Sequence, residues 1–187
     1  MTATSDQPSA RTQRTLISVD AMGGDQGPAI VVAGCSASAL KNPDISFILH
    51  GPAEALEPLV AKRPELKGRC TIRDAQGVVT MDDKPSNVVR NGKGTSMWSA
   101  IESVRDNEAS VAVSCGTTGA LMALSMIRLK KLPGVNRPAI AVLYPSTNPQ
   151  GFNVLLDVGA DVRADADDLL RYALMGKSYA RNGMDIE

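Results

Sequence analysis

The sequence predicts an α/β protein built on a doubly wound parallel sheet. Short apolar runs alternate with segments of helical periodicity from residue 15 to the end of the 187-residue chain. Glycine-rich turns follow some of these runs, as in SVDAMGGDQGP at residues 18–28. Hydrophobic residues make up 43% of the chain but aromatic residues only 3%, so we expect a core of aliphatic side chains.

The N-terminal region predicts a tail, a strand and a helix, in that order. Residues 1–14 are too poor in apolar side chains to offset the entropy of ordering, so we expect them to be disordered. The β-branched run at 15–20 predicts the first strand. A helix is expected over 29–41, with Pro28 at its first position, where the missing N–H costs nothing.

The alternation continues through the next fifty residues. An apolar run, a helical pattern that contains Pro58 and a more polar extended run come first, and a segment broken by prolines and glycines follows. These patterns predict a strand at 44–51, a helix at 53–63, a strand at 68–75 and a short helix at 85–91.

The centre of the chain predicts a strand between two helices. Helical periodicity resumes over 95–107, where three apolar residues share one face. The continuous apolar character of 109–115 predicts a strand buried on both faces. A strong helical pattern over 117–131 has basic residues in its last turn and is ended by the Leu-Pro-Gly that follows.

The last part predicts two strands and a closing helix. The strands are expected at 138–146 and 152–159, and a turn rich in Pro, Asn and Gly joins them. The helix at 165–183 is acidic at its start and basic at its end, as the helix dipole favours. We see no internal repeat and no linker, and the pattern stops where a further strand would be expected.

The composition excludes several classes of function. Lysine plus arginine and aspartate plus glutamate number 20 each, so no net field favours binding to nucleic acid or to an anionic membrane. The three cysteines lie far apart with neither metal-binding spacing nor a disulfide framework, which fits a reducing cytosol. No apolar run reaches the ~18 residues of a membrane-spanning helix. We therefore expect a cytoplasmic protein.

The loop after the first strand is a candidate ligand site, because ligands of open α/β sheets bind beyond the carboxyl ends of the strands. Asp20 ends the strand, and Gly23, Gly24 and Asp25 follow it. The glycines either bring the backbone close to a ligand or make a tight turn in which Asp25 caps the next helix. The spacing is not GxGxxG, so it gives little support for dinucleotide binding.

Two further loops carry features of an anion site. Residues 114–120, SCGTTGA, can direct several N–H groups and two hydroxyls from Gly116, Thr117, Thr118 and Gly119 toward one point at a helix N-terminus. The alternative is a plain turn capped by a threonine. Residues 90–97, RNGKGTSM, place cations and hydroxyls before another helix, which suits a phosphate but also fits a solvated face.

Other polar residues are open to more than one interpretation. Asp157 at a strand end either binds substrate or caps a turn, and Arg137 either contacts substrate or forms a structural salt bridge. Cys115 has no histidine near it in the sequence, and His50 is the only histidine, so a Cys–His nucleophile is not supported. No GxSxG motif appears either, so the chemistry is expected to need no protein nucleophile.

Five segments, in this order, resemble signatures of the PlsX family, the bacterial phosphate acyltransferases of phospholipid synthesis. They are ISVDAMGGDQGP, VTMDDKPSNVVRNGKGTSM, SCGTTGALMA, LPGVNRPAIAV and LLDVGADV. The resemblance runs from Leu16 to the end and covers only the N-terminal half of the longer family members. It implies that residues 15–187 are the N-terminal part of a single α/β acyltransferase domain. It implies a three-layer α/β/α sandwich of the isopropylmalate-dehydrogenase-like fold, related to phosphotransacetylases and incomplete here at the C-terminus.

The resemblance also implies an activity and partners. Family members make acyl phosphate from acyl-acyl-carrier-protein and inorganic phosphate, without metal or nucleotide cofactor, and act as homodimers. Their product is used by a membrane glycerol-3-phosphate acyltransferase, which implies loose association with the inner membrane face.

Matching segments give the site residues that we expect. The catalytic residues are Lys93, Ser96 and Asp20. The substrate-binding residues are Gly23, Gly24, Asp25, Arg90, Thr95, Gly116, Thr117, Thr118, Gly119, Arg137 and Asp157. This sequence has Gly92 where the family usually has a lysine, Cys115 where alanine is common, Thr117 where the family has asparagine and His50 where an apolar residue is usual.

These expectations combine into one mechanism. The amides of Gly116–Gly119, the threonine hydroxyls and Lys93 hold phosphate near the thioester carbonyl, phosphate attacks, and the carrier thiolate leaves. Asp20 and Asp25, which would repel the anion directly, are expected to contact Lys93 or Arg137 or to cap amides. The alternatives are an acyltransferase that uses acyl-coenzyme A, a nicotinamide-dependent dehydrogenase of similar fold, and an inactive fragment or binding module.

Overall fold

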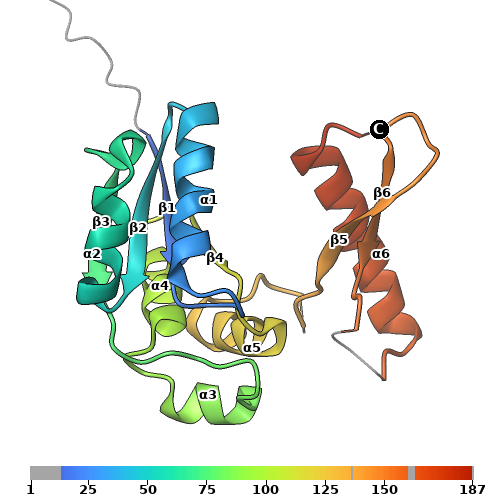
Figure 1. Ribbon diagram of the computed structural model, residues 1–187. Coiled ribbons are helices and arrows are strands. Elements are labelled where there is room, and N and C mark those ends of the chain that lie inside the picture. Colours follow the sequence, from blue (N-terminus) through green and yellow to red (C-terminus); the bar gives the residue numbers. More distant parts are fainter. Residues whose placement is uncertain (1–13, 136, 160–162, 187) are drawn as a thin grey trace, which may run out of the picture. The chain divides into compact units, whose positions relative to one another are not determined.

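The computed structural model describes residues 14–135, 137–159 and 163–186 and divides into two compact units. The first unit ends at Leu129 and the second begins at Lys130 (Figure 1). Each unit is described by itself. The predicted disordered tail falls almost entirely outside the described residues.

The first unit contains a four-stranded sheet in which all strands are parallel, as the sequence predicts. The strand order is β3-β2-β1-β4 (Figure 1). The strands are β1 (Thr15–Asp20), β2 (Ile45–Gly51), β3 (Cys70–Asp74) and β4 (Val111–Ser114). In register, Asp20 lies between His50 of β2 and Ser114 of β4, so three polar residues meet at the carboxyl edge of the sheet.

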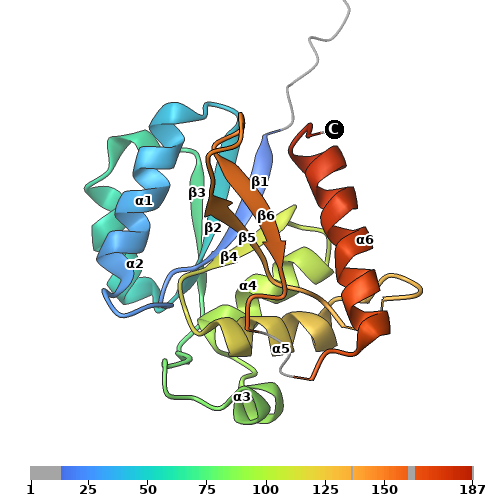
Figure 2. The same cartoon turned by 90° about the vertical axis from the view of Figure 1, so that its right-hand side faces the viewer.

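Helices cover both faces of this sheet (Figure 2). One layer contains α1 (Pro28–Lys41) and α2 (Ala53–Ala61), followed by the short 3-10 helix η1 (Pro64–Leu66). The opposite layer contains α4 (Ser96–Arg105) and α5 (Thr118–Arg128), with α3 (Pro85–Asn91) packed against α5. Each of the five α-helices overlaps a range that the sequence predicts, whereas η1 was not predicted.

The two helical layers enclose separate aliphatic cores. The core on the α1 side combines side chains such as Val19, Val32 and Leu49 with the aromatic ring of Phe47. The core on the α4 side is built from Val79, Val88, Met97, Ile101, Ala120 and Leu124. The predicted aliphatic character of the core is therefore confirmed in the first unit.

Strand β4 differs from the prediction of a fully buried strand. Val111 and Val113 are each 43% exposed, whereas Ala112 packs against the core on the α4 side. The reason is position, because β4 is an edge strand and α1 lies over β1 and β2. The apolar sequence of a parallel strand does not reveal whether both of its faces are covered within the unit.

The second unit is a β-hairpin with one helix. Strands β5 (Ala141–Pro145) and β6 (Phe152–Leu156) pair antiparallel, and α6 (Ala166–Gly183) packs on β6. These two strands are therefore not parallel neighbours of each other. The six-residue connection at 146–151 is the physical reason, since parallel neighbours need a crossover of about a dozen residues or more.

Helix α6 has the charge distribution that the sequence predicts. Asp165 caps it, accepting from the N–H of Asp168 at 2.9 Å, and the Asp168 side chain accepts from the Asp165 N–H to complete a capping box. Arg181 lies in the last turn, where a cation is favourable. Among the described residues, no helix is both long enough and apolar enough to cross a membrane.

Candidate active site

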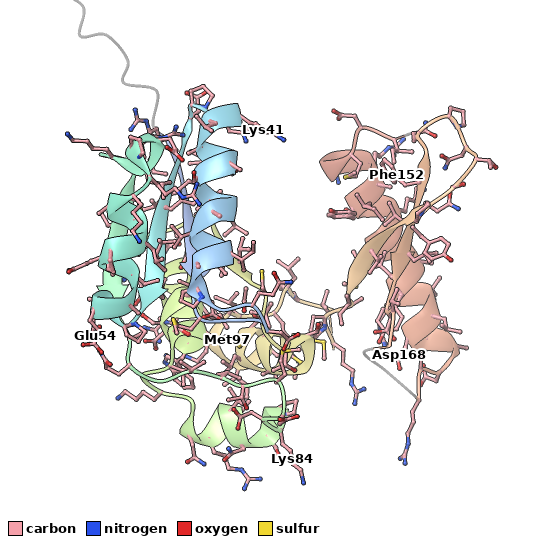
Figure 3. The ribbon with its side chains drawn as sticks, viewed as in Figure 1. Lys41, Glu54, Lys84, Met97, Phe152 and Asp168 are labelled. Atoms are coloured by element: carbon pink, nitrogen blue, oxygen red, sulfur yellow. The ribbon has the colours of Figure 1, made fainter. Side chains whose placement is uncertain are left out.

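The candidate site lies at the carboxyl edge of the four-stranded sheet, where the loops after β1 and β4 meet. The first loop contains Gly23 and Gly24, and the second contains Gly116 and Gly119. Met97 on α4, labelled in Figure 3, has its methyl group against Gly116 of the second loop. The strands fix the start of both loops, because Asp20 and Ser114 are partners in the parallel ladder.

Asp20 is the centre of a short hydrogen-bonded chain. Its side chain is buried, and Oδ2 accepts a hydrogen bond of 2.7 Å from the Ser114 hydroxyl. The Ser114 Oγ in turn accepts from the Gly116 N–H at 3.0 Å, and Asp20 Oδ1 accepts from the Met22 N–H at 3.3 Å. The carboxylate thus accepts hydrogen bonds from a hydroxyl and from a backbone amide of the protein. The hydroxyl partner, Ser114, in turn contacts the second loop.

Gly23 allows the two loops to touch. A Cβ atom at this position would lie 2.7 Å from Asp20 Oδ2 and 2.8 Å from both the Gly116 nitrogen and the Ser114 hydroxyl oxygen. Gly24 has a φ of 96°, and a Cβ there would lie 3.0 Å from the Cys115 carbonyl oxygen. The close backbone approach that the sequence predicts is therefore an approach of one loop to the other.

Two helices pack directly against the second loop. A Cβ atom at Gly116 would lie 2.8 Å from the Met97 methyl group, and one at Gly119 would lie 3.1 Å from the Pro85 ring. The starts of α3 and α4 therefore flank the start of α5. Because only a small residue fits at Gly116 and Gly119, the N-termini of these three helices can lie close together.

The N-terminus of α5 has the features of an anion site. Thr117 is the N-cap residue, but its side chain makes no capping hydrogen bond, so the interpretation of this turn as a threonine-capped helix start was wrong. In the part of the chain that the structure describes, no hydrogen bond occupies the hydroxyl of Thr117 or Thr118. The first amides of a helix lack intrahelical partners, and they favour a negative charge.

The loop between α3 and α4 supplies cations and hydroxyls. Arg90 and Lys93 are exposed, and neither forms an ion pair among the described residues. Thr95 caps α4: its hydroxyl donates to the Gly92 carbonyl at 2.7 Å and accepts from the Trp98 N–H at 3.3 Å. These two hydrogen bonds engage the Thr95 hydroxyl in capping α4.

Ser96 is the buried hydroxyl of this loop. Only 1% of the residue is exposed, and its Oγ has no hydrogen-bond partner among the described groups. Its N–H donates to the Gly77 carbonyl at 2.9 Å, which fixes the backbone there. An unsatisfied buried hydroxyl costs about 1–3 kcal/mol, and a ligand that bonds to it would recover this cost.

The remaining expected site residues are Asp25, in the loop between β1 and α1, and Arg137 and Asp157 of the second unit. The expectation that Asp25 caps α1 was wrong, because Gly27 is the N-cap and no side chain caps that helix. Asp25 is exposed and has no ion pair among the described residues. Arg137 and Asp157 belong to the second unit, where the Asp157 N–H donates to the Ile140 carbonyl at 2.8 Å. A role for either in the site remains a prediction.

Ser114 is a site residue that sequence reasoning missed. It links the Asp20 carboxylate to the Gly116 amide and therefore sets the conformation of the second loop. Its only signal in the sequence is its position as the last residue of a predicted strand before a glycine-rich turn. That it faces Asp20 depends on the strand order β1-β4, which the sequence does not give.

His50 forms a second buried network beneath the site. It is fully buried, with Nε2 2.9 Å from Ser18 Oγ and Nδ1 2.8 Å from Ser99 Oγ. Ser18 donates to the Ala100 carbonyl at 2.8 Å, so it accepts from the Nε2–H of a neutral imidazole. Burial, with a smaller contribution from the nearby Arg73, lowers the pKa of His50 to about 4. This histidine is structural and joins the sheet to α4.

The fold and the candidate site define a class: an α/β protein with a parallel sheet and a candidate anion site where a glycine-rich loop enters a helix. Over residues 15–187 the sequence matches the family described as "Fatty acid synthesis protein". The chain belongs to this family, which confirms the resemblance found in the sequence. The same match covers both units of the structure.

Known relatives carry the name phosphate acyltransferase. The protein from Roseobacter denitrificans is 75% identical over 186 residues, covering 100% of this chain and 52% of the relative. That from Ruegeria sp. is 74% identical over 186 residues, covering 100% of this chain and 50% of the relative. That from Paracoccus denitrificans is 74% identical over 172 residues, or 92% of this chain and 46% of the relative. The chain thus spans about half the length of these relatives.

Proposed function

We propose that this chain forms part of a phosphate acyltransferase that makes acyl phosphate from acyl-acyl-carrier-protein and inorganic phosphate, for phospholipid synthesis. The names of relatives that are 74–75% identical support the reaction. The structural observation that carries the proposal is the Asp20–Ser114–Gly116 chain, which holds a glycine-rich loop open at the start of α5. Such a loop suits inorganic phosphate, the substrate that distinguishes this reaction.

The proposed reaction needs no protein nucleophile. A phosphate oxygen attacks the thioester carbonyl carbon and forms the new C–O bond. The tetrahedral oxyanion then collapses, the C–S bond breaks, and the carrier leaves as its thiolate. Amides at the start of α5, with the hydroxyls of Thr117 and Thr118, bind the phosphate, and Lys93 offsets its charge. Correct orientation of the two reactants lowers the barrier by up to about 7–11 kcal/mol.

Ser96 and Asp20 have separate roles in this proposal. Ser96 donates its hydroxyl to the oxyanion, because this hydroxyl is buried without a partner among the described groups and Ser96 precedes Met97, whose methyl group lies against Gly116. Loss of one such donor typically costs about 2.7–4 kcal/mol of transition-state stabilisation. Asp20 acts through Ser114 and positions the loop that binds phosphate.

Trapping of acyl phosphate as a hydroxamate tests the reaction. The assay compares this chain with a chimaera in which it replaces the matched part of the Roseobacter denitrificans relative, each with acyl-carrier-protein thioester and phosphate. Hydroxamate formation that requires phosphate supports the proposal, and its absence in the chimaera would overturn it. Faster reaction with acyl-coenzyme A than with the carrier protein would instead favour the phosphotransacetylase-like alternative.

The family also suggests properties of the whole enzyme that we propose with it. These are the isopropylmalate-dehydrogenase-like fold formed by a single domain, a homodimer, and a cytoplasmic location at the inner membrane face near a glycerol-3-phosphate acyltransferase. The four-stranded parallel sheet with helices on both faces is compatible with that fold. Sedimentation of the chimaera, and its partition onto vesicles of bacterial phospholipid, test the oligomer and the membrane contact.

A further inference from the structure

Helix α4 presents a row of three serines to the sheet of the first unit. Ser96, Ser99 and Ser103 are spaced three and four residues apart, so they lie on one face of the helix. Ser96 and Ser103 are each only 1% exposed, and α4 packs on β1, β2 and β4. Hydroxyls rather than aliphatic side chains therefore form this part of the contact between the helix and the sheet.

The sheet supplies partners for two of these three hydroxyls. Ser99 Oγ lies 2.8 Å from Nδ1 of His50 on β2, and Ser103 Oγ accepts from Nη1 of Arg73 on β3 at 2.9 Å. His50 and Arg73 are partners in the parallel ladder, so both reach α4 from the same face of the sheet. Ser96 Oγ has no partner within the described residues. The hydroxyl at the start of the helix, beside the candidate site, is thus the one left free.

A closed chain of hydrogen bonds passes through His50. Ser18 donates to the Ala100 carbonyl, so its Oγ accepts from the Nε2–H of His50. Burial lowers the pKa of His50 to about 4, so the imidazole is neutral at pH 7 and its Nδ1 accepts from the Ser99 hydroxyl. The chain leaves α4 at Ser99 and returns at Ala100. Bonds at two adjacent residues restrain the helix against rotation about its axis.

We infer that His50 is a positioning residue for Ser96, and this inference rests on the proposed function, in which Ser96 donates to the oxyanion. Ser96 precedes Ser99 by nearly one turn on the same face. A rotation of α4 that brought the Ser96 hydroxyl to a protein partner would break the bonds at Ser99 and Ala100. His50 thus keeps this hydroxyl buried and free for the substrate, although a buried hydroxyl without a partner is unfavourable by itself.

A double-mutant cycle in the chimaera tests the assignment. Ser96→Ala is expected to lower kcat about a hundredfold or more, as the loss of one oxyanion donor does. His50→Leu should lower kcat at least about tenfold alone but less than about twofold in the Ser96→Ala background, because it acts through Ser96. His50→Asn should keep kcat within about threefold of the unsubstituted chimaera, because its amide oxygen can accept from Ser99 as Nδ1 does. An unchanged kcat in His50→Leu, or a full tenfold loss in the Ser96→Ala background, would overturn the inference.

Ser36→Ala is the matched control. Ser36 lies on α1 in the opposite helical layer, is 2% exposed and donates a hydrogen bond to Glu65. Its substitution removes the bond of a buried serine that does not contact α4. We expect it to lower the midpoint of urea denaturation and to leave kcat unchanged, which separates a general loss of stability from a loss of positioning.

Crystal structures of this chain and of its His50→Leu variant give a readout that does not depend on the reaction. In the variant we expect α4 to be turned and Ser96 Oγ to have gained a protein partner. An unchanged α4 with a free Ser96 hydroxyl would overturn the inference, whatever the activity of the chimaera. If the helix turns but the unsubstituted chimaera makes no acyl phosphate, the proposed function fails and the positioning of Ser96 by His50 stands.

Discussion

Replacement of Gly23 by alanine should disrupt the candidate site through a single added methyl group. The new Cβ would lie within 2.8 Å of three polar atoms, those of Asp20, Ser114 and Gly116. These atoms make the 2.7 Å bond from Ser114 to Asp20 and the 3.0 Å bond from Gly116 to Ser114. Hydrogen bonds to a charged group contribute about 1.5–3 kcal/mol and neutral ones about 0.5–1.5 kcal/mol. Loss of both therefore lowers the free energy of unfolding by about 2–4.5 kcal/mol.

Urea denaturation of this chain measures the effect. The control is Gly34→Ala on α1, where an added Cβ would meet no atom within 4 Å and alanine improves helix propensity by up to about 1 kcal/mol. We expect Gly23→Ala to lower the midpoint and Gly34→Ala to keep or raise it. A Gly23→Ala protein as stable as the unsubstituted chain would show that the two loops are not held in contact, and the account of the site would fail.

Three further predictions concern charge and reactivity. Lys93→Ala should raise the KM for phosphate at least about tenfold in the chimaera, since a charge-assisted contact contributes about 1.5–3 kcal/mol. Lys41→Ala, at the far end of α1, is the control and should leave the KM unchanged. An unchanged KM in Lys93→Ala would show that Lys93 does not contact phosphate. His50 has its pKa lowered from 6.5 to about 4 in the folded protein, so the unfolded chain binds the proton first as the pH falls. The contribution of His50 to stability is therefore full above about pH 6.5 and is lost as the pH falls toward 4, by up to about 3 kcal/mol. Urea melts at several pH values should show this part of the slope lost in His50→Asn, while carboxylates with a lowered pKa, such as Asp74 and Glu108, keep their own dependence at lower pH. Cys115 is exposed, whereas burial raises the pKa of Cys35 to about 12 and that of Cys70 to about 11. A thiol reagent at pH 8 should therefore modify Cys115 first, and mass spectrometry that finds Cys35 labelled first would contradict this order.

Local patterns predicted the elements well because each has a local cause. Pro28 sets the start of α1, and the paired aspartates at 165 and 168 set the start of α6. The environment of an element is not local. The apolar run of β4 looks the same whether its second face is covered or open, and only the strand order shows that Val113 lies at an edge.

The candidate site was predictable in its loops but not in its contacts. The glycine-rich loops after β1 and β4 were visible as turns between strands and helices, and the structure brings them together. Asp20 was expected to contact a cation or to cap an amide; the Met22 amide is one of its partners, and the Ser114 hydroxyl is a partner that was not expected. That contact joins residues 94 positions apart, and it follows from the pairing of β1 with β4 rather than from any local pattern.

Phosphate titration followed by amide chemical shifts tests the central claim most directly, because the claim places phosphate at the start of α5. The measurement uses this chain and the chimaera, labelled with ¹⁵N, with chloride at equal ionic strength as the control. The account predicts saturable shifts of the amides of Gly116–Ala120, and their loss in Ser114→Ala, which breaks the link from Asp20 to Gly116. Saturable phosphate binding that leaves these amides unshifted would contradict it.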